Sequence, residues 1–109
     1  MILPIVQRKL PKTYNYVYQN YGQSSNLFFG DGIIDSSEGV QQGDPLGPFL
    51  FSLGTIDITK SMESELNLWY LDDGCIAGEI ESVLKCFKLI LNAKSTHGLE
   101  INPSKCELY

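Results

Sequence analysis

The stretch LNLWYLDDGCIAG, residues 66–78, places Asp72 beside Asp73 between two apolar runs. Residues Leu66 to Leu71 and Cys75 to Ala77 predict two β-strands, because each run is short, largely apolar and bounded by turn residues. Asp and Gly tolerate the backbone of a tight turn. The stretch therefore predicts a β-hairpin with two adjacent carboxylates at its tip.

The carboxylate pair has two interpretations. Read alone, it is ordinary hairpin-turn chemistry. It is also a candidate metal site, because hard cations such as Mg²⁺ prefer oxygen ligands and take one or two carboxylates together with substrate phosphates. Two such ions, about 3.5–4 Å apart, can stabilise the attacking and leaving oxygens of a phosphoryl transfer. From this stretch alone, the turn and the metal site both remain open.

A second motif, GVQQGDPLGPFLFSL, occupies residues 39–53. Gly43 lets backbone approach a ligand closely, and Gln42 offers an amide donor and acceptor. A helix is predicted from about Pro45 to Met62, with Asp44 as its cap. A helix start favours an anion such as a triphosphate, although a loop before a capped helix is also common where no ligand binds. The predicted apolar stripe of this helix consists of Leu46, Phe49, Leu50, Leu53 and Ile56.

The segments on either side alternate between helix and hairpin patterns. Residues Pro11 to Gly22 predict a helix with an apolar and tyrosine stripe, which we interpret as core packing. The segment NLFFGDGIIDS, residues 26–36, predicts a hairpin around a Gly-Asp-Gly turn. A third helix is predicted from Ile80 to near Gly98. The first stripe consists of Tyr14, Val17, Tyr18 and Tyr21, and that of the third helix of Ile80, Val83, Leu84, Phe87, Ile90 and Leu91.

The tail LEINPSKCELY, residues 99–109, predicts a short strand, a turn at Pro103 and a second strand. The order helix, hairpin, helix, hairpin, helix, strands predicts an α+β fold, with a small antiparallel sheet and helices packed on one face. A length of 109 residues allows one domain at most.

The charge, the cysteine and histidine content and the first ten residues exclude several classes of protein. A net charge of −5 and a pI of about 4.6 argue against a free-standing nucleic-acid-binding protein, which usually has a basic face. The spacing of Cys75, Cys86, Cys106 and the single His97 fits neither a disulfide framework nor a zinc site. The start, MILPIVQRKL, is too short and too soon interrupted for a signal peptide or a membrane span. We therefore expect an intracellular setting, in the cytoplasm or nucleus, and no membrane partner.

A third motif, GLEINPSKCEL, residues 98–108, contains Lys105 after a proline turn. A lone lysine is most often a solvated surface charge. Near a polyphosphate, the same side chain could neutralise negative charge or donate a proton to a leaving group.

Taken together, GVQQGDPLGP, YLDDG and GLEINPSKCE, in this order and at these intervals, resemble the reverse transcriptase domain of non-LTR (LINE-type) retrotransposons. The resemblance covers nearly the whole chain and is strongest from Ser37 to Leu108. It implies a polymerase palm that binds divalent metal, Mg²⁺ or Mn²⁺, and extends a DNA primer with dNTPs on an RNA template.

The resemblance also implies a role for individual residues. Asp72 matches the main metal-ligating aspartate of the family, and Asp73 matches its lesser partner. Tyr70 matches the aromatic position near the primer end. Lys105 matches the lysine proposed to assist the departure of pyrophosphate. The incoming nucleotide's site is matched by Gln42 and Gly43.

The chain departs from the family pattern upstream. The 38 residues before Gly39 contain no strand with the further aspartate that a two-metal polymerase needs, because Asp31 and Asp35 lack the required setting. We also expect the fingers and the thumb to lie outside these residues. We therefore expect residues 1–109 to be an incomplete reverse transcriptase domain, inactive alone, binding nucleic acid weakly and self-associating through an exposed sheet edge.

Two alternatives remain. In the first, the chain is a non-catalytic retroelement remnant that is either inert or retained as a binding or assembly module. In the second, it is another palm polymerase, such as a viral RNA-directed RNA polymerase or a telomerase. The second alternative is less favoured, because viral RNA polymerases place glycine before the aspartate pair, whereas this chain has Tyr70 and Leu71 there.

Overall fold

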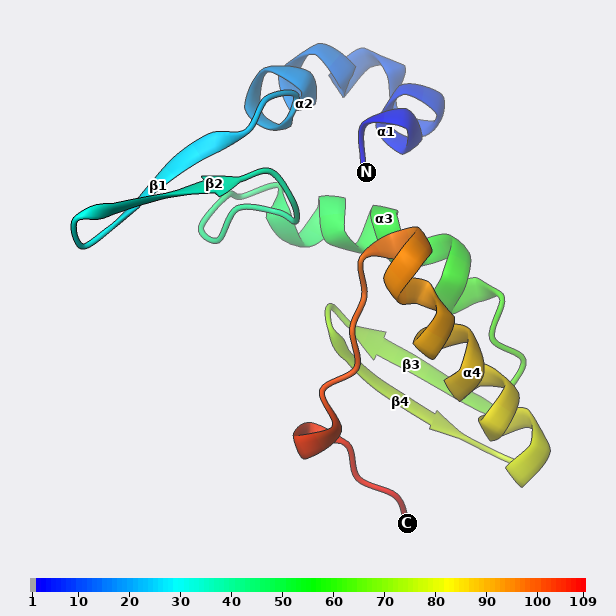
Figure 1. Cartoon of the computed structure of the whole chain (residues 1–109). Helices are drawn as coiled ribbons and strands as arrows, with labels where there is room; N and C mark the ends of the chain where they lie inside the picture. Colours follow the sequence, from blue (N-terminus) through cyan, green and yellow to red (C-terminus); the bar gives the residue numbers. More distant parts are fainter. Residues whose placement is uncertain (1) are drawn as a thin grey trace. The chain divides into compact units, whose positions relative to one another are not determined.

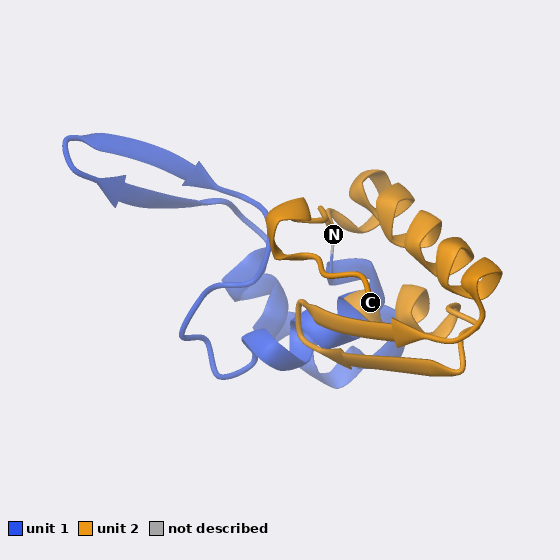
Figure 2. Cartoon of the chain, turned by 90° about the horizontal axis from the view of Figure 1, so that it is seen from below, with its two compact units in different colours: residues 1–54 blue, residues 55–109 orange. Residues whose placement is uncertain are grey.

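The chain alternates helices with β-hairpins, and the computed structural model describes residues 2–109. Within these residues it has four α-helices and four β-strands, arranged as two separate two-stranded antiparallel sheets (Figure 1). The predicted α+β class is therefore confirmed. The residues divide into two units, Met1–Gly54 and Thr55–Tyr109, and the division falls within helix α3 (Figure 2).

The first unit buries its core between helices. Val6, Val17 and Leu50 are almost completely buried there, and Tyr14 and Tyr21 pack against them. The helices and strands of this unit are α1 (Leu3–Lys9), the 3-10 helix η1 (Pro11–Thr13), α2 (Tyr14–Tyr21), β1 (Ser25–Phe29), β2 (Gly32–Ser36) and the start of α3 (Gly47–Lys60).

The second unit packs a hairpin against helices. Trp69 and Ile76 from the hairpin contact a core formed by the end of α3 and by α4, so that one face of the small sheet is covered, as predicted. The core residues are Ile58, Met62, Cys86 and Ala93. After α3, this unit consists of β3 (Leu66–Tyr70), β4 (Asp73–Ala77), α4 (Ile80–His97) and the 3-10 helix η2 (Pro103–Lys105).

The C-terminal ends of α4 and α2 lie at or next to the glycines that the sequence predicts. Gly98 follows α4 in the left-handed conformation, with φ 69°, and its N–H caps the helix by bonding to the carbonyl of Ala93. Lys94 lies in the last turn of α4, where its positive charge complements the helix dipole. Helix α2 ends at Tyr21, one residue before the predicted stop at Gly22.

Part of the predicted helix faces is wrong. Phe49, Ile80, Leu84 and Leu91 were assigned to buried stripes, yet each is at least half exposed. On α4, the small side chains of Cys86 and Ala93 are buried instead. Large apolar residues dominate the hydrophobic pattern of a helix in the sequence. Small residues are easily overlooked there, although small side chains permit close packing of a helix against its neighbours.

The predicted tail strands are also wrong. Pro103–Lys105 form the 3-10 helix η2, and no residue from 99 to 109 lies in a strand. The Asn102 side chain accepts a hydrogen bond from the Ser104 N–H at 3.1 Å, which starts the turn, and Pro103 supplies a helical φ. This local bonding competes successfully with extended backbone.

Helix α1 differs from the sequence predictions, which contain no helix before Pro11. Pro4 lies in its first turn, where its missing N–H costs nothing. Val6 of this helix is fully buried in the core of the first unit. No α-helix among residues 2–109 combines the length and the apolar composition that crossing a membrane requires.

Candidate active site

The two aspartates lie at the tip of the β3–β4 hairpin, but they do not share one turn. The strands pair from Leu66↔Ala77 to Tyr70↔Asp73, so that the loop consists of Leu71 and Asp72 alone. Asp73 is the first residue of β4, which corrects the prediction of strands that leave both carboxylates in the turn. Pairing extends to Asp73 because a two-residue loop suffices to reverse an antiparallel chain.

Leu71 adopts a positive φ of 55°, unlike every other described non-glycine residue. A leucine in this left-handed region costs about 1–2 kcal/mol relative to ordinary backbone. Such a cost persists where the surrounding structure determines the conformation, and it often occurs at functional sites. The conformation of this loop therefore depends on the hydrogen bonds and packing contacts of the two strands that it connects.

The packed face of the hairpin supplies that support. The Asn67 amide donates to the Thr59 carbonyl at 2.8 Å and to the Met62 carbonyl at 3.2 Å, which ties β3 to the end of α3. Its oxygen accepts the indole N–H of Trp69 at 2.7 Å. The Trp69 ring lies over Gly74 so closely that a Cβ on Gly74 would come within 2.4 Å of it. Hydrogen bonds and packing on this face therefore hold the hairpin against the end of α3.

The opposite face of the hairpin is exposed and carries the candidate catalytic residues. Tyr70 and Asp73 are cross-strand partners next to the loop, and the Tyr70 side chain is 78% exposed. Together with Leu68 and the free thiol Cys75, they line a shallow concavity of about 320 Å³, to which Trp69 and Gly74 also contribute. Packing on one face thus presents the other face, with its carboxylate, to solvent.

The donor chemistry of the tip suits a hard divalent cation. Asp72 and Asp73 are both exposed and adjacent, and Mg²⁺ in proteins takes one or two carboxylates with substrate phosphates. Within residues 2–109, no group of three or more His, Cys, Asp or Glu side chains is arranged to hold a metal ion. The carboxylates of Asp72 and Asp73 are therefore candidate ligands, without a third such side chain grouped with them in this part of the chain.

The second candidate region is the turn from Gln41 to Asp44, in the first unit. Gln42 and Gly43 are exposed, and Gly43 has a φ of 87°, which glycine adopts readily. Asp44 accepts the Leu46 N–H at 2.9 Å, as the predicted cap requires, although regular helix begins only at Gly47. The turn is closed by the Asp44 N–H, which donates to the Gln41 carbonyl at 3.3 Å.

Sequence reasoning missed the residue that braces this turn. The Tyr21 hydroxyl donates to the Asp44 carboxylate and accepts the Gln41 N–H at 3.4 Å. The Tyr21 hydroxyl, followed by the Leu46 N–H, holds the pKa of Asp44 below its usual value. Burial, followed by the bond to Asp44, raises the pKa of Tyr21, and the Gln41 N–H partly offsets this rise. Tyr21 had been assigned to the core stripe, where its ring does pack.

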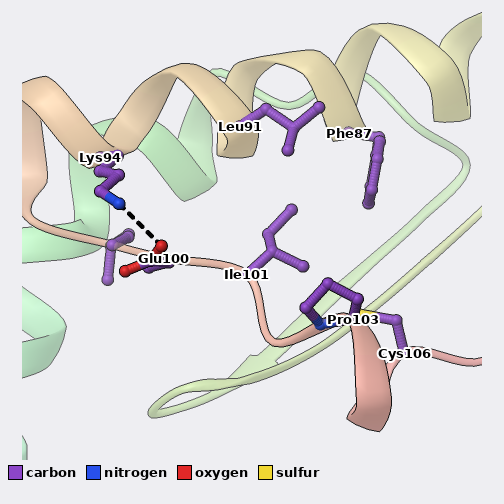
Figure 3. A pocket seen from close by; sticks show the side chains of 8 residues that line it. Phe87, Leu91, Lys94, Glu100, Ile101, Pro103 and Cys106 are labelled. Atoms are coloured by element: carbon purple, nitrogen blue, oxygen red, sulfur yellow. Dashed lines mark hydrogen bonds and ion pairs between the residues drawn. The ribbon is translucent and has the colours of Figure 1, made fainter.

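Lys105 is exposed and lies in η2, at the end of the tail. The tail and α4 enclose a pocket of about 300 Å³ (Figure 3). An exposed ion pair between Lys94 and Glu100, at 2.7 Å, lies at its rim and contributes little to stability because both side chains are solvated. The apolar lining comes from Phe87, Leu91, Leu99, Ile101 and Pro103, with Cys106 beside them.

The structure brings some candidate residues together. Tyr70, Asp72 and Asp73 share one hairpin tip, and Gln42 and Gly43 share one turn in the other unit. Among the described residues, no hydrogen bond or ion pair connects Lys105 with the hairpin tip.

Comparison with known proteins agrees with the motifs. A family model described as "Reverse transcriptase (RNA-dependent DNA polymerase)" matches residues 5–109. No curated protein and no solved structure matches the chain.

Proposed function

The chain belongs to the reverse transcriptase family, and from this premise we propose that it forms the palm part of an RNA-directed DNA polymerase from a non-LTR (LINE-type) retrotransposon. The proposed subtype is supported by the sequences GVQQGDPLGP, YLDDG and GLEINPSKCE in that order. In this proposal, residues 1–109 are an incomplete reverse transcriptase domain in an intracellular protein.

One observation carries the proposal. Asp72 lies in the two-residue loop and Asp73 follows it as the first residue of β4, on a hairpin of which one face is held by Asn67 and Trp69. A hairpin backbone that is held in this way reduces the reorganisation needed when a cation and a triphosphate arrive, which is the basis of electrostatic preorganisation.

Each candidate residue then has a role. Asp72 is the main metal ligand and Asp73 the lesser one, and the bound Mg²⁺ or Mn²⁺ would neutralise charge on the phosphates of the incoming nucleotide. Tyr70, exposed beside Asp73, would contact the primer end. Gln42 and Gly43 would line the site of the incoming dNTP.

Lys105 would assist the leaving pyrophosphate by neutralising its charge or by donating a proton. In the reaction, the primer 3′-hydroxyl gives up its proton to water, and its oxygen bonds to the α-phosphorus of the dNTP. The bond from that phosphorus to the bridging oxygen of pyrophosphate breaks. The residues of this chain would bind and orient the reacting groups.

We further propose that these residues alone do not complete a two-metal site, since Asp72 and Asp73 are joined by no third carboxylate among residues 2–109. The net charge of −5 supports only weak binding of the RNA template and DNA primer. The β3–β4 sheet has only two strands, so each strand has an unpaired edge. Such an edge would allow two copies of the chain to associate.

A second candidate function is favoured by the β1–β2 hairpin. Its large apolar side chains are more than half exposed, which suits a non-catalytic binding or assembly module of retroelement origin. These side chains are Leu27, Phe28, Phe29, Ile33 and Ile34. Capture of one specific partner, lost on Phe28→Ser, together with the absence of any metal-dependent chemistry, would favour this function.

The polymerase proposal is tested by template-directed primer extension with Mg²⁺ or Mn²⁺. Any incorporation should disappear in Asp72→Asn and persist in Asp31→Asn, which removes the carboxylate at the equivalent loop position of the other hairpin. Incorporation that survives Asp72→Asn would contradict the assignment of the metal site. No incorporation by the unmodified chain is the result that an incomplete two-metal site predicts.

A further inference from the structure

The turn that carries Gln42 and Gly43 is held at both ends by one hydroxyl group. The Tyr21 hydroxyl donates to the carboxylate of Asp44 and accepts the N–H of Gln41 at 3.4 Å. Gln42 and Gly43 are the two residues between these partners. The Tyr21 side chain, from the end of α2, therefore bonds to both ends of the segment proposed to line the nucleotide site.

The position of this hydroxyl is fixed by packing. The Tyr21 ring contacts the core cluster of the first unit, which includes the fully buried Val6 and Val17. Val40 and Leu46, on either side of the turn, pack against the same cluster. The ring and both flanks of the turn therefore share one support, and the hydroxyl has little freedom to leave its partners.

The carboxylate of Asp44 uses both oxygens. One accepts the Tyr21 hydroxyl and the other accepts the Leu46 N–H at 2.9 Å. Hydrogen bonds to an ionised carboxylate are about twice as strong as neutral ones. The main-chain carbonyl of Asp44 also accepts the Gly47 N–H at 2.9 Å, at the first residue of α3. The turn is thus bonded to α2 on one side and to α3 on the other.

We propose that Tyr21 is a positioning residue, whose hydroxyl holds the Gln41–Asp44 turn in the conformation that presents Gln42 and Gly43 to the incoming dNTP. This inference rests on the proposed function, since it assumes that those two residues line the nucleotide site. It predicts that removing one oxygen atom, which belongs to neither Gln42 nor Gly43, weakens nucleotide binding.

The test compares Tyr21→Phe with Tyr18→Phe in the 109-residue chain. Both changes delete only a hydroxyl from α2, but Tyr18 is half exposed and belongs to the same helix without bonding the turn. A second variant, Asp44→Ser, keeps a side chain that can cap the helix and is too short to reach Tyr21. Circular dichroism of each variant establishes that the helices are retained.

The first readout is the titration of the Asp44 carboxyl, followed by NMR. Because the bond from Tyr21 lowers the pKa of Asp44 from its ordinary value of 3.8, Tyr21→Phe should move the midpoint upward, and Tyr18→Phe should leave it unchanged. A lowered pKa in the folded state means that this bond stabilises the fold above pH 3.8 and that its contribution is lost as the pH falls through the lowered pKa.

The second readout is the affinity for dATP with Mg²⁺, measured from the amide shifts of Gln42 and Gly43. Tyr21→Phe should weaken binding by about tenfold, the loss expected for one hydrogen bond to a charged group. Asp44→Ser should weaken it to a similar extent, and the double variant should bind no more weakly than either single variant, because both remove the same bond.

The outcomes separate the inference from its premise. If Tyr21→Phe shifts the Asp44 titration but leaves dATP affinity unchanged, the bond exists and its positioning role is wrong. If neither readout moves, the bond itself is refuted. If the unmodified chain shows no shift of Gln42 or Gly43 with dATP and Mg²⁺, the proposed nucleotide site fails, and the positioning role fails with it, while the titration still decides whether Tyr21 braces the turn.

Discussion

The two hairpins of this chain have the same plan and opposite surroundings. Each has two five-residue strands and a two-residue loop, with a positive φ at the first loop residue and an aspartate at the second. In β1–β2 the loop is Gly30-Asp31, and every residue of β1 is exposed. In β3–β4 the loop is Leu71-Asp72, and alternate residues of β3 are half buried.

Matching positions show what the surroundings change. Asn26 and Asn67 both occupy the second position of the first strand, but only Asn67 bonds to the end of a helix. Phe28 and Trp69 both occupy the fourth position, where Phe28 is 79% exposed and Trp69 packs against a core. An isolated two-stranded hairpin is marginally stable in water, whereas packing of one face stabilises it. The supported hairpin is the one that tolerates a leucine at positive φ.

The largest expected effect comes from Gly74→Ala. The added Cβ would meet three atoms of the Trp69 ring at 2.4–2.7 Å, and the ring is held by packing and by Asn67. Overpacking of this kind should lower the free energy of unfolding by about 3 kcal/mol. In the other hairpin, Gly32→Ala meets only the Phe29 carbonyl oxygen at 3.4 Å and should be neutral or slightly stabilising. Urea unfolding of both variants measures the difference, and equal effects would refute it.

Asn67→Ala should come next, with a loss of about 2 kcal/mol, because it leaves the half-buried indole N–H of Trp69 and two carbonyls at the end of α3 without their partner. Its counterpart Asn26→Ala removes an exposed side chain and should change the stability by less than about 0.5 kcal/mol. If the two alanine variants unfold at the same urea concentration, the bracing of β3 by Asn67 is not what distinguishes the hairpins.

The loop residues should show a smaller effect. Leu71→Ile places a β-branched side chain at a φ of 55° and should cost about 1 kcal/mol, while Leu71→Asn should be better tolerated, since asparagine adopts this conformation more readily. Thermal unfolding distinguishes the two variants. A stability for Leu71→Ile equal to that of the unmodified chain would show that the loop relaxes out of the left-handed region.

The comparison also explains how far the sequence could predict the structure. Both hairpins and helices α2 to α4 follow from local patterns, and the cap at Asp44 and the stop at Gly98 follow from residue chemistry. The difference between the hairpins could not be predicted, because alternation of polar and apolar residues does not say which strand finds a helix to cover it. For the same reason, the sequence pattern could not predict which residues of α4 are buried.

For the site, the motifs predicted the hairpin tip and the Gln42 turn but not the residues that hold them. Asn67 and Tyr21 act through contacts with residues 8 and 23 positions away in sequence, respectively. The one available signal was the last tyrosine of α2, whose hydroxyl must find a partner when its ring packs against a core. The predicted tail strands are wrong for another reason. The Asn102 side chain accepts the N–H of Ser104, and this local bond favours the 3-10 helix η2 over extended backbone.

The most direct test of the central claim is a Mn²⁺ titration of the isotope-labelled chain, followed by paramagnetic broadening of its NMR signals. Both hairpins carry an aspartate at the second loop position, so they compete within one sample. The account predicts that signals of residues 70–74 broaden at a lower Mn²⁺ concentration than those of residues 29–32, and that Asp72→Asn abolishes this preference while Asp31→Asn does not. Equal broadening at the two tips, or a preference for the Asp31 loop, would contradict the assignment of Asp72 and Asp73 as a metal site.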